Sequence, residues 1–270
     1  AYGMVLTQSF NGAGDTATVT NSGTIIATAR EKYADAYGAT VSVAGDATFT
    51  NAAGGVIDVN GGYARGALVI SAGGNTAVGN AGNINVYGGK YGAGMVSSAQ
   101  NGLATASNSG DITITGGFNQ SYGILAQGLN GTTVSNSGDI VVDTALASLS
   151  FGINATSGLG DVTVDNSGTI YATYTGGYSG TAFGILGVST NGNVAIDNSG
   201  EIVTYVGGQS VGVFGVSSYG DVSVDNSGSI TAYSGSSAAV GVFARADNGM
   251  ASVDNSGSVL AYSNSGVAYG

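Results

Sequence analysis

The stretch Asp161–Ile170, with the sequence DVTVDNSGTI, recurs in close copies along the chain. The clearest other copies are NVAIDNSGEI at Asn193–Ile202, DVSVDNSGSI at Asp221–Ile230 and MASVDNSGSV at Met250–Val259. With looser copies nearer the N-terminus, the repeated asparagine falls at Asn21, Asn51, Asn80, Asn108, Asn136, Asn166, Asn198, Asn226 and Asn255. Neighbouring copies are 28 to 32 residues apart, which is a period typical of stacked structural units.

Each repeat divides into three short segments. Segment a is centred on an aromatic or apolar residue, a glycine and a second apolar residue, as in Phe151-Gly152-Ile153. Segment b leads up to the asparagine, and in it Val162 and Val164 alternate with polar residues. Segment c follows Asn-Ser-Gly and is shorter, as in Ile230-Thr231-Ala232. A period of two indicates strands with one buried face, and no helical period is present.

Three strands and three turns in about 29 residues predict a right-handed parallel β-helix, or β-solenoid. About nine such coils form a single array over residues 1–270, and equivalent residues stack as ladders. We expect the nine asparagines to occupy one corner, where Asn and Gly provide left-handed backbone for a tight bend. Both ends of the sequence fall in the same phase of the repeat, which suggests a segment of a longer repeat region or a unit that stacks end to end.

The alternation also predicts which side chains face the core. The Ile and Val positions of segments b and c should point inward, together with the aromatic residue and the Ile of segment a. The glycine between them should then point outward, beside the residue two positions later. Large apolar residues at that later position are interface candidates, because they predict a ridge covered by another chain or by the chain's own loops. They are Leu125, Leu186, Phe214 and Phe243.

The composition excludes several kinds of chemistry. The 270 residues include 50 Gly but no Pro, Cys, His or Trp. Thiolate nucleophiles, imidazole bases and the usual zinc ligands are therefore absent. The net charge is −11, of which −10 falls on residues 101–270. Such a surface repels nucleic acid and anionic lipid, and no apolar run is long enough for a transmembrane helix.

The repeated DNSGxI, together with Tyr or Phe followed by Gly-Ile, resembles the passenger domains of bacterial type V autotransporters and related large β-solenoid surface adhesins. The resemblance extends over nearly the whole chain. It implies secretion across a Gram-negative envelope and display at the cell surface. Because the sequence contains neither a signal peptide nor a C-terminal barrel, we expect either an excised passenger segment or a repeat that has converged on the same pattern because the fold imposes it.

Four aspartates precede the asparagines of the clearest copies, and they are the candidate metal ligands. Their alternation with inward residues predicts an outward acidic ladder, formed by Asp165, Asp197, Asp225 and Asp254. Oxygen-rich ladders suit hard cations such as Ca²⁺, although a solvated acidic face is the simpler interpretation. Asp161 and Asp221 lie on the same predicted face, and carboxylates two coils apart have a separation near that of an inverting glycosidase pair. Regular repetition argues against an active site, which is normally singular.

Outward tyrosines form a second predicted ladder in segment c, at Tyr87, Tyr205, Tyr233 and Tyr262. Exposed stacked tyrosines suit contacts with sugars or with another protein, or they stack on one another for structural reasons. An ice-binding face would require a repeated outward Thr-x-Thr pattern. Within segment c, Thr113 and Thr115 supply one such element, and the neighbouring coils do not repeat it.

These observations favour a non-enzymatic, extracellular structural or adhesive segment that binds no cofactor other than a possible Ca²⁺. The expected partners are chains of the same kind or cell-surface glycans, and neither nucleic acid nor membrane insertion is expected. A self-assembling filament or sheath subunit is the first alternative, and a polysaccharide-active β-helix enzyme is the second.

Overall fold

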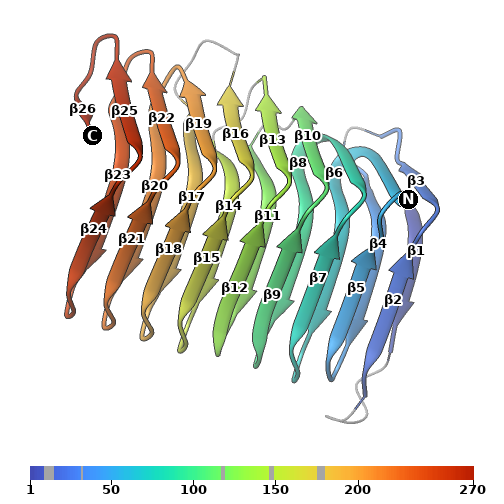
Figure 1. Ribbon diagram of the computed structural model, residues 1–270. Helices are drawn as coiled ribbons and strands as arrows, with labels where there is room; N and C mark the ends of the chain where they lie inside the picture. The colour runs from blue at the N-terminus through green and yellow to red at the C-terminus, as the bar shows by residue number, and fades with distance from the viewer. Residues whose placement is uncertain (9–14, 32, 117–118, 146–148, 175–179) are drawn as a thin grey trace.

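The computed structural model describes residues 1–8, 15–31, 33–116, 119–145, 149–174 and 180–270. These residues form a parallel β-solenoid, in which the chain winds repeatedly through strands that stack along one axis (Figure 1). No helix among them has the length and apolarity needed to cross a membrane.

Segment b forms a nine-stranded parallel sheet, held by eight in-register pairings. The pairings join residues 28 to 32 positions apart, as in Asn136 with Asn166. The expected coil of about 29 residues is therefore confirmed. From the first of these nine strands to the last, the chain completes eight full repeats. The strands are β2 (Ala17–Asn21), β5 (Ala47–Asn51), β7 (Thr76–Asn80), β9 (Leu103–Asn108), β12 (Gly131–Asn136), β15 (Val162–Asn166), β18 (Val194–Asn198), β21 (Val222–Asn226) and β24 (Ala251–Asn255).

Segments c and a belong to one 17-stranded parallel sheet. They join because β6 (Val56–Ser71) and β8 (Asn83–Ala99) run through both segments without a break. The other segment c strands are β3 (Thr24–Thr28), β10 (Asp111–Gly116), β13 (Asp139–Thr144), β16 (Thr169–Tyr174), β19 (Glu201–Val206), β22 (Ser229–Ser234) and β25 (Ser258–Ser263). The other segment a strands are β1 (Tyr2–Thr7), β4 (Asp35–Val43), β11 (Gln120–Gly128), β14 (Leu149–Ser157), β17 (Thr181–Ser189), β20 (Gln209–Ser217), β23 (Ala239–Ala246) and β26 (Ala268–Tyr269).

A narrow apolar core runs along the axis between the two sheets. In the coil of β15 and β16 it holds Val162, Val164 and Ile170, each fully buried, and segment a adds Ile153. Equivalent Ile, Val and Ala residues repeat this arrangement in the neighbouring coils. The inward face predicted for segments b and c is thus the one observed, because a strict period of two places every second residue on the same side.

The orientation predicted for the aromatic residues of segment a is wrong. Tyr122 and Phe151 are not part of the central core; they form a separate buried cluster with Ala93 and Val96. The glycine predicted to face outward instead faces the core. A Cβ on Gly152 would overlap the side chain of Ile170 and would lie 2.6 Å from the backbone oxygen of Gly184.

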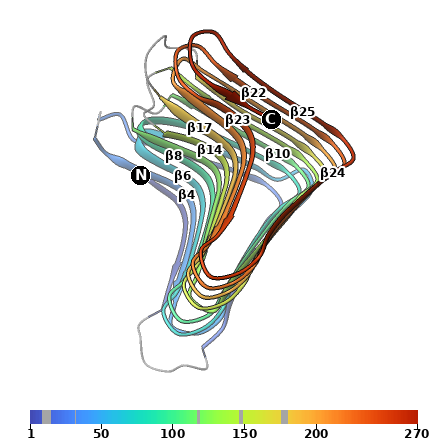
Figure 2. The ribbon, with the colours of Figure 1, turned by 90° about the vertical axis from the view of Figure 1, so that its left-hand side faces the viewer.

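The cause is a bend in the strand at this glycine. The register passes from Tyr122 paired with Phe151 to Ile124 paired with Ile153 and omits the glycines between them. Gly152 and Ile153 both face inward, so alternation changes phase at this point, as it does at a β-bulge. Figure 2 shows that the segment a strands bend toward the interior, so that their outer side is concave. Aromatic side chains on that side therefore converge and bury one another.

Candidate functional site

The corner between segments b and c is built on a continuous ladder of asparagine amides. Each Nδ2 donates to Oδ1 of the asparagine in the next coil over 2.7 to 2.8 Å, in eight bonds from Asn21 to Asn255. Nearly every Nδ2 also donates to the backbone oxygen two residues later, as Asn166 does to Gly168 over 3.2 Å. All members except Asn255 are buried. Because all the amide dipoles point the same way, neighbouring bonds strengthen one another.

The Asn-Ser-Gly copies of the corner do not use left-handed backbone, contrary to the expectation from their Asn and Gly content. The divergent corner after Asn51 does so at Gly54, which has a φ of 80°. Among the described residues no amino acid other than glycine has a positive φ, and the Asn-Ser-Gly glycines do not have one either. These glycines are needed for space. A Cβ on Gly168 would overlap the backbone oxygen of Gly138 in the preceding coil, and the same close approach recurs along the corner.

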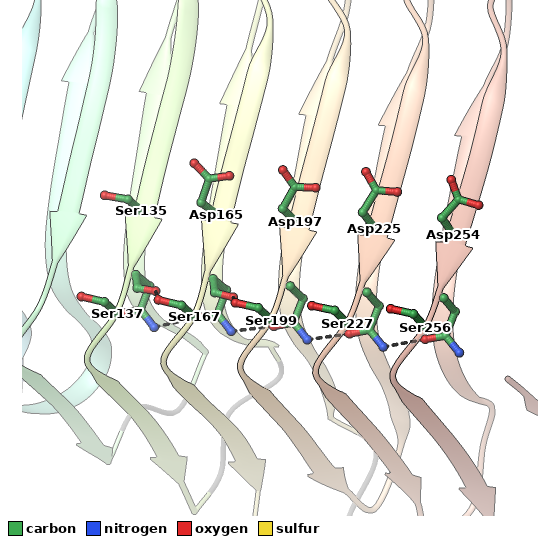
Figure 3. Close-up of a pocket in the computed structure, with 15 residues that line it drawn as sticks. Ser135, Ser137, Asp165, Ser167, Asp197, Ser199, Asp225, Ser227, Asp254 and Ser256 are labelled. Carbon is green, nitrogen blue, oxygen red and sulfur yellow. Dashed lines mark hydrogen bonds between the residues drawn. The ribbon is translucent and has the colours of Figure 1, made fainter.

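Outside this corner lies a polar groove of about 750 Å³. Its lining comes from the ends of β12, β15, β18, β21 and β24, which supply the ladder asparagines and, directly before each of them, an outward aspartate or, in β12, Ser135. The serines that directly follow these strands complete the lining. Asp165, Asp197, Asp225 and Asp254 are exposed and pair in register. Figure 3 shows their carboxylates pointing the same way, above a row of serine hydroxyls. The four predicted acids are thus neighbours in one groove.

No group of three or more His, Cys, Asp or Glu residues in the described ranges is arranged to hold a metal ion. Asp161 and Asp221 were considered above as possible catalytic acids. Both accept hydrogen bonds from backbone N–H groups of the next coil. Oδ1 of Asp161 accepts from the amide of Asn193 over 2.7 Å, and Oδ1 of Asp221 accepts from that of Met250 over 2.8 Å. These bonds fasten one coil to the next.

We expect Asp197→Asn to stabilise the protein at low ionic strength. Asp197 lies between Asp165 and Asp225, and stacked carboxylates about 4.8 Å apart repel by about 1 kcal/mol or less per neighbour in water. Urea unfolding at about 0.01 M and about 1 M salt measures the difference, because screening removes the repulsion at the higher concentration.

The matched opposite variant is Ser135→Asp, which adds a carboxylate beside Asp165 and should destabilise with the same salt dependence. If neither variant changes stability at low salt, the ladder repulsion is negligible. A Ca²⁺ effect on the wild-type protein that exceeds that of monovalent salt at equal ionic strength would show that this face holds a cation.

A second ladder, of ring contacts and not of equivalent residues, runs along the concave outer side of segment a, with one ring or guanidinium from each coil. Tyr91 and Phe214 lie outside the register column of Phe151, since they pair with Gln120 and Leu186. The stacked pairs Tyr122–Phe151 and Phe151–Phe183 have centroids 4.9 and 5.2 Å apart. The complete series is Tyr2, Tyr37, Arg65, Tyr91, Tyr122, Phe151, Phe183, Phe214 and Phe243. Burial, and to a smaller extent the neighbouring Tyr91, raises the pKa of Tyr122 to about 12.

The four interface candidates all lie on this outer side. Leu125 and Leu186 pack against the aromatic cluster. Phe214 is half-buried, and Phe243 is 37% exposed and stacks on Phe214 with centroids 4.7 Å apart. We expected loops or another chain to cover these four side chains. Neighbouring side chains of the same ladder provide much of that cover. The glycines predicted to point outward beside them face the core instead.

The outward tyrosines of segment c form a third ladder. Tyr205, Tyr233 and Tyr262 stack with centroids 4.5 and 5.2 Å apart and interplanar angles of 13° and 19°. Tyr205 is 47% exposed and Tyr262 50%. Tyr87 occupies the same column, but its neighbours there are Asn60 and Thr115. The sequence therefore placed all four residues in the correct column, and three of them form a stack.

Two further features were missed from the sequence. The turn between segments a and b is bonded by a serine nine residues before the asparagine; Ser189 accepts from Gly192 and donates to Gly160 over 2.9 Å each. A second Thr-x-Thr pattern lies on the outer face of segment b, at Thr18 with Thr20 and Thr48 with Thr50, in register. It ends at Ala77 and Gly79 of the next strand. The serine spacing was a readable signal, because it also occurs at Ser71, Ser157 and Ser217.

No protein-family model matches the chain, and no curated protein or solved structure matches it either.

Proposed function

We propose that this β-solenoid is a non-enzymatic surface rod that adheres to repeating polymers, of which cell-surface glycans are the favoured class. The observation that carries the proposal is the in-register tyrosine stack of β19, β22 and β25. A repeating ligand meets the same group at each coil, so that several weak contacts act together. Tyrosine suits this role because it offers an apolar ring edge and a hydroxyl that bonds to sugar hydroxyls.

The proposed location is the bacterial cell surface, as part of a passenger-type adhesin. The support for it is the resemblance of the DNSGxI repeats to such passengers, together with a rigid rod that displays repeated groups along its length. The acidic groove adds the expectation that the ligand is neutral or cationic, since four stacked carboxylates repel anionic polymers.

The test is binding of the purified protein to a panel of immobilised polysaccharides. The triple variant Tyr205→Ser, Tyr233→Ser and Tyr262→Ser should lose most of the binding while its circular dichroism spectrum is retained. Tyr219→Ser is the control, because Tyr219 is 64% exposed and lies outside the stack.

Binding that survives the triple variant would assign adhesion to another face. Failure to bind any glycan, combined with concentration-dependent fibres in sedimentation and electron microscopy, would replace the proposal by the filament alternative.

A further inference from the structure

The stack of Tyr205, Tyr233 and Tyr262 has a chemical property that needs no ligand. Its rings are close and nearly parallel, with centroids 4.5 and 5.2 Å apart, and the central ring, Tyr233, is half-buried. Tyr205 exposes 47% and Tyr262 50% of its surface. Exposed side chains change rotamer within picoseconds to nanoseconds, so neighbouring ring carbons approach one another repeatedly. In-register pairing of β19, β22 and β25 keeps the three rings adjacent throughout.

Most other rings of the protein lack this combination. Tyr122 is buried, and one of its stacking neighbours is Phe151, which carries no phenol. Tyr2 and Tyr37 also stack, with centroids 5.1 Å apart. The hydroxyl of Tyr37, however, has two partners, since it donates to Asp35 and accepts from Arg65 over 2.9 Å. The hydroxyl of Tyr233 has one, because it accepts from Nδ2 of Asn264 over 2.7 Å.

We propose that Tyr205, Tyr233 and Tyr262 are a site of oxidative tyrosine coupling, at which a one-electron oxidant such as a peroxidase joins neighbouring rings by a carbon–carbon bond. Each of two phenols loses one electron to the oxidant and one proton to water. The two radicals couple at carbons adjacent to the hydroxyl-bearing carbons, and tautomerisation restores both phenols. The net change is the loss of two electrons and two protons for each bond formed.

Such a bond would fasten one coil to the next. Solenoid coils interact only with their neighbours, so an array opens by separation of adjacent coils. A link from Tyr205 to Tyr233, or from Tyr233 to Tyr262, closes a loop of one coil and reduces the freedom of the unfolded chain, as a disulfide does. In a chain without cysteine, the tyrosine stack would take the place of a covalent staple.

The test uses the full chain at high dilution with a haem peroxidase and hydrogen peroxide. All samples carry Tyr2→Phe, which removes the other stacked tyrosine pair. The expected product is a monomer with dityrosine fluorescence, an intact mass lower by two hydrogens, and a cross-linked peptide that contains Tyr233. Its urea midpoint should be higher than that of the untreated protein.

Tyr233→Phe removes the ring shared by both pairs and should reduce the fluorescence to that of untreated protein, whereas Tyr219→Phe should leave the yield unchanged. The proposal is overturned if coupling persists in Tyr233→Phe, or if all cross-links join separate molecules. Loss of glycan binding by the serine variants bears only on adhesion, so the two proposals fail separately.

Discussion

Asn166→Asp should destabilise the solenoid by about 3 to 5 kcal/mol at neutral pH, although it changes a single atom group. The Nδ2 of Asn166 donates to Oδ1 of Asn198 over 2.7 Å and to the backbone oxygen of Gly168 over 3.2 Å. A carboxylate at this buried position would place an oxygen, which cannot donate, against these two acceptor oxygens. It would also bury a negative charge that has no positive partner. Guanidinium unfolding of the variant and of the wild-type protein measures the difference.

The loss should depend on pH in a defined direction. Burial and the two facing oxygens raise the folded-state pKa of the new carboxyl above its unfolded value of about 3.9. The folded state then binds the proton more tightly, so the variant's stability is retained below about pH 4 and lost as pH rises through the folded-state pKa. A protonated carboxyl also donates to Asn198, as the amide did.

Asn255→Asp is the matched control, because Asn255 is the last member of the ladder, is exposed, and donates only to Gly257. Its effect should be small at every pH. Equal losses for the two variants, or a loss at Asn166 that is independent of pH, would show that the ladder is not the reason for the effect.

Gly152→Val should cost more than about 3 kcal/mol and abolish the bend of segment a in its coil. The added side chain would overlap Ile170 and would lie 2.6 Å from the backbone oxygen of Gly184. Both contacts involve the closely packed core, so relief requires the neighbouring coil to move away. Thermal unfolding and hydrogen exchange of the surrounding coils measure the loss and its extent along the array.

Gly23→Val is the control, since a Cβ on Gly23 meets no atom within 4 Å. It should be tolerated with little change. Equal tolerance of Gly152→Val would contradict the inward orientation of this glycine. It would favour the outward orientation that simple alternation predicts.

The tyrosine face for which we propose glycan binding and oxidative coupling was predictable from the sequence only in part. The column of Tyr205, Tyr233 and Tyr262 follows from the repeat, because equivalent positions must stack. Their ring spacing and exposure depend on side-chain rotamers and on neighbours such as Asn264, which donates to the hydroxyl of Tyr233 over 2.7 Å. The groove beside the acidic ladder could likewise not be predicted from the sequence, because it depends on the three-dimensional shape of the corner.

The sequence by itself determined the parallel solenoid, its coil length, the asparagine corner and the inward Ile and Val residues of segments b and c. Each of these depends on one repeat and one uninterrupted alternation, and both are readable from residue spacing. Only the tertiary structure decided which way segment a faces. Gly152 and Ile153 point inward together because the strand bends where only a glycine fits against Ile170. Such a bend is set by contact with the next coil, so it leaves no period in the sequence, and it places Phe151 and its register partners Tyr122 and Phe183 on the outer side of segment a.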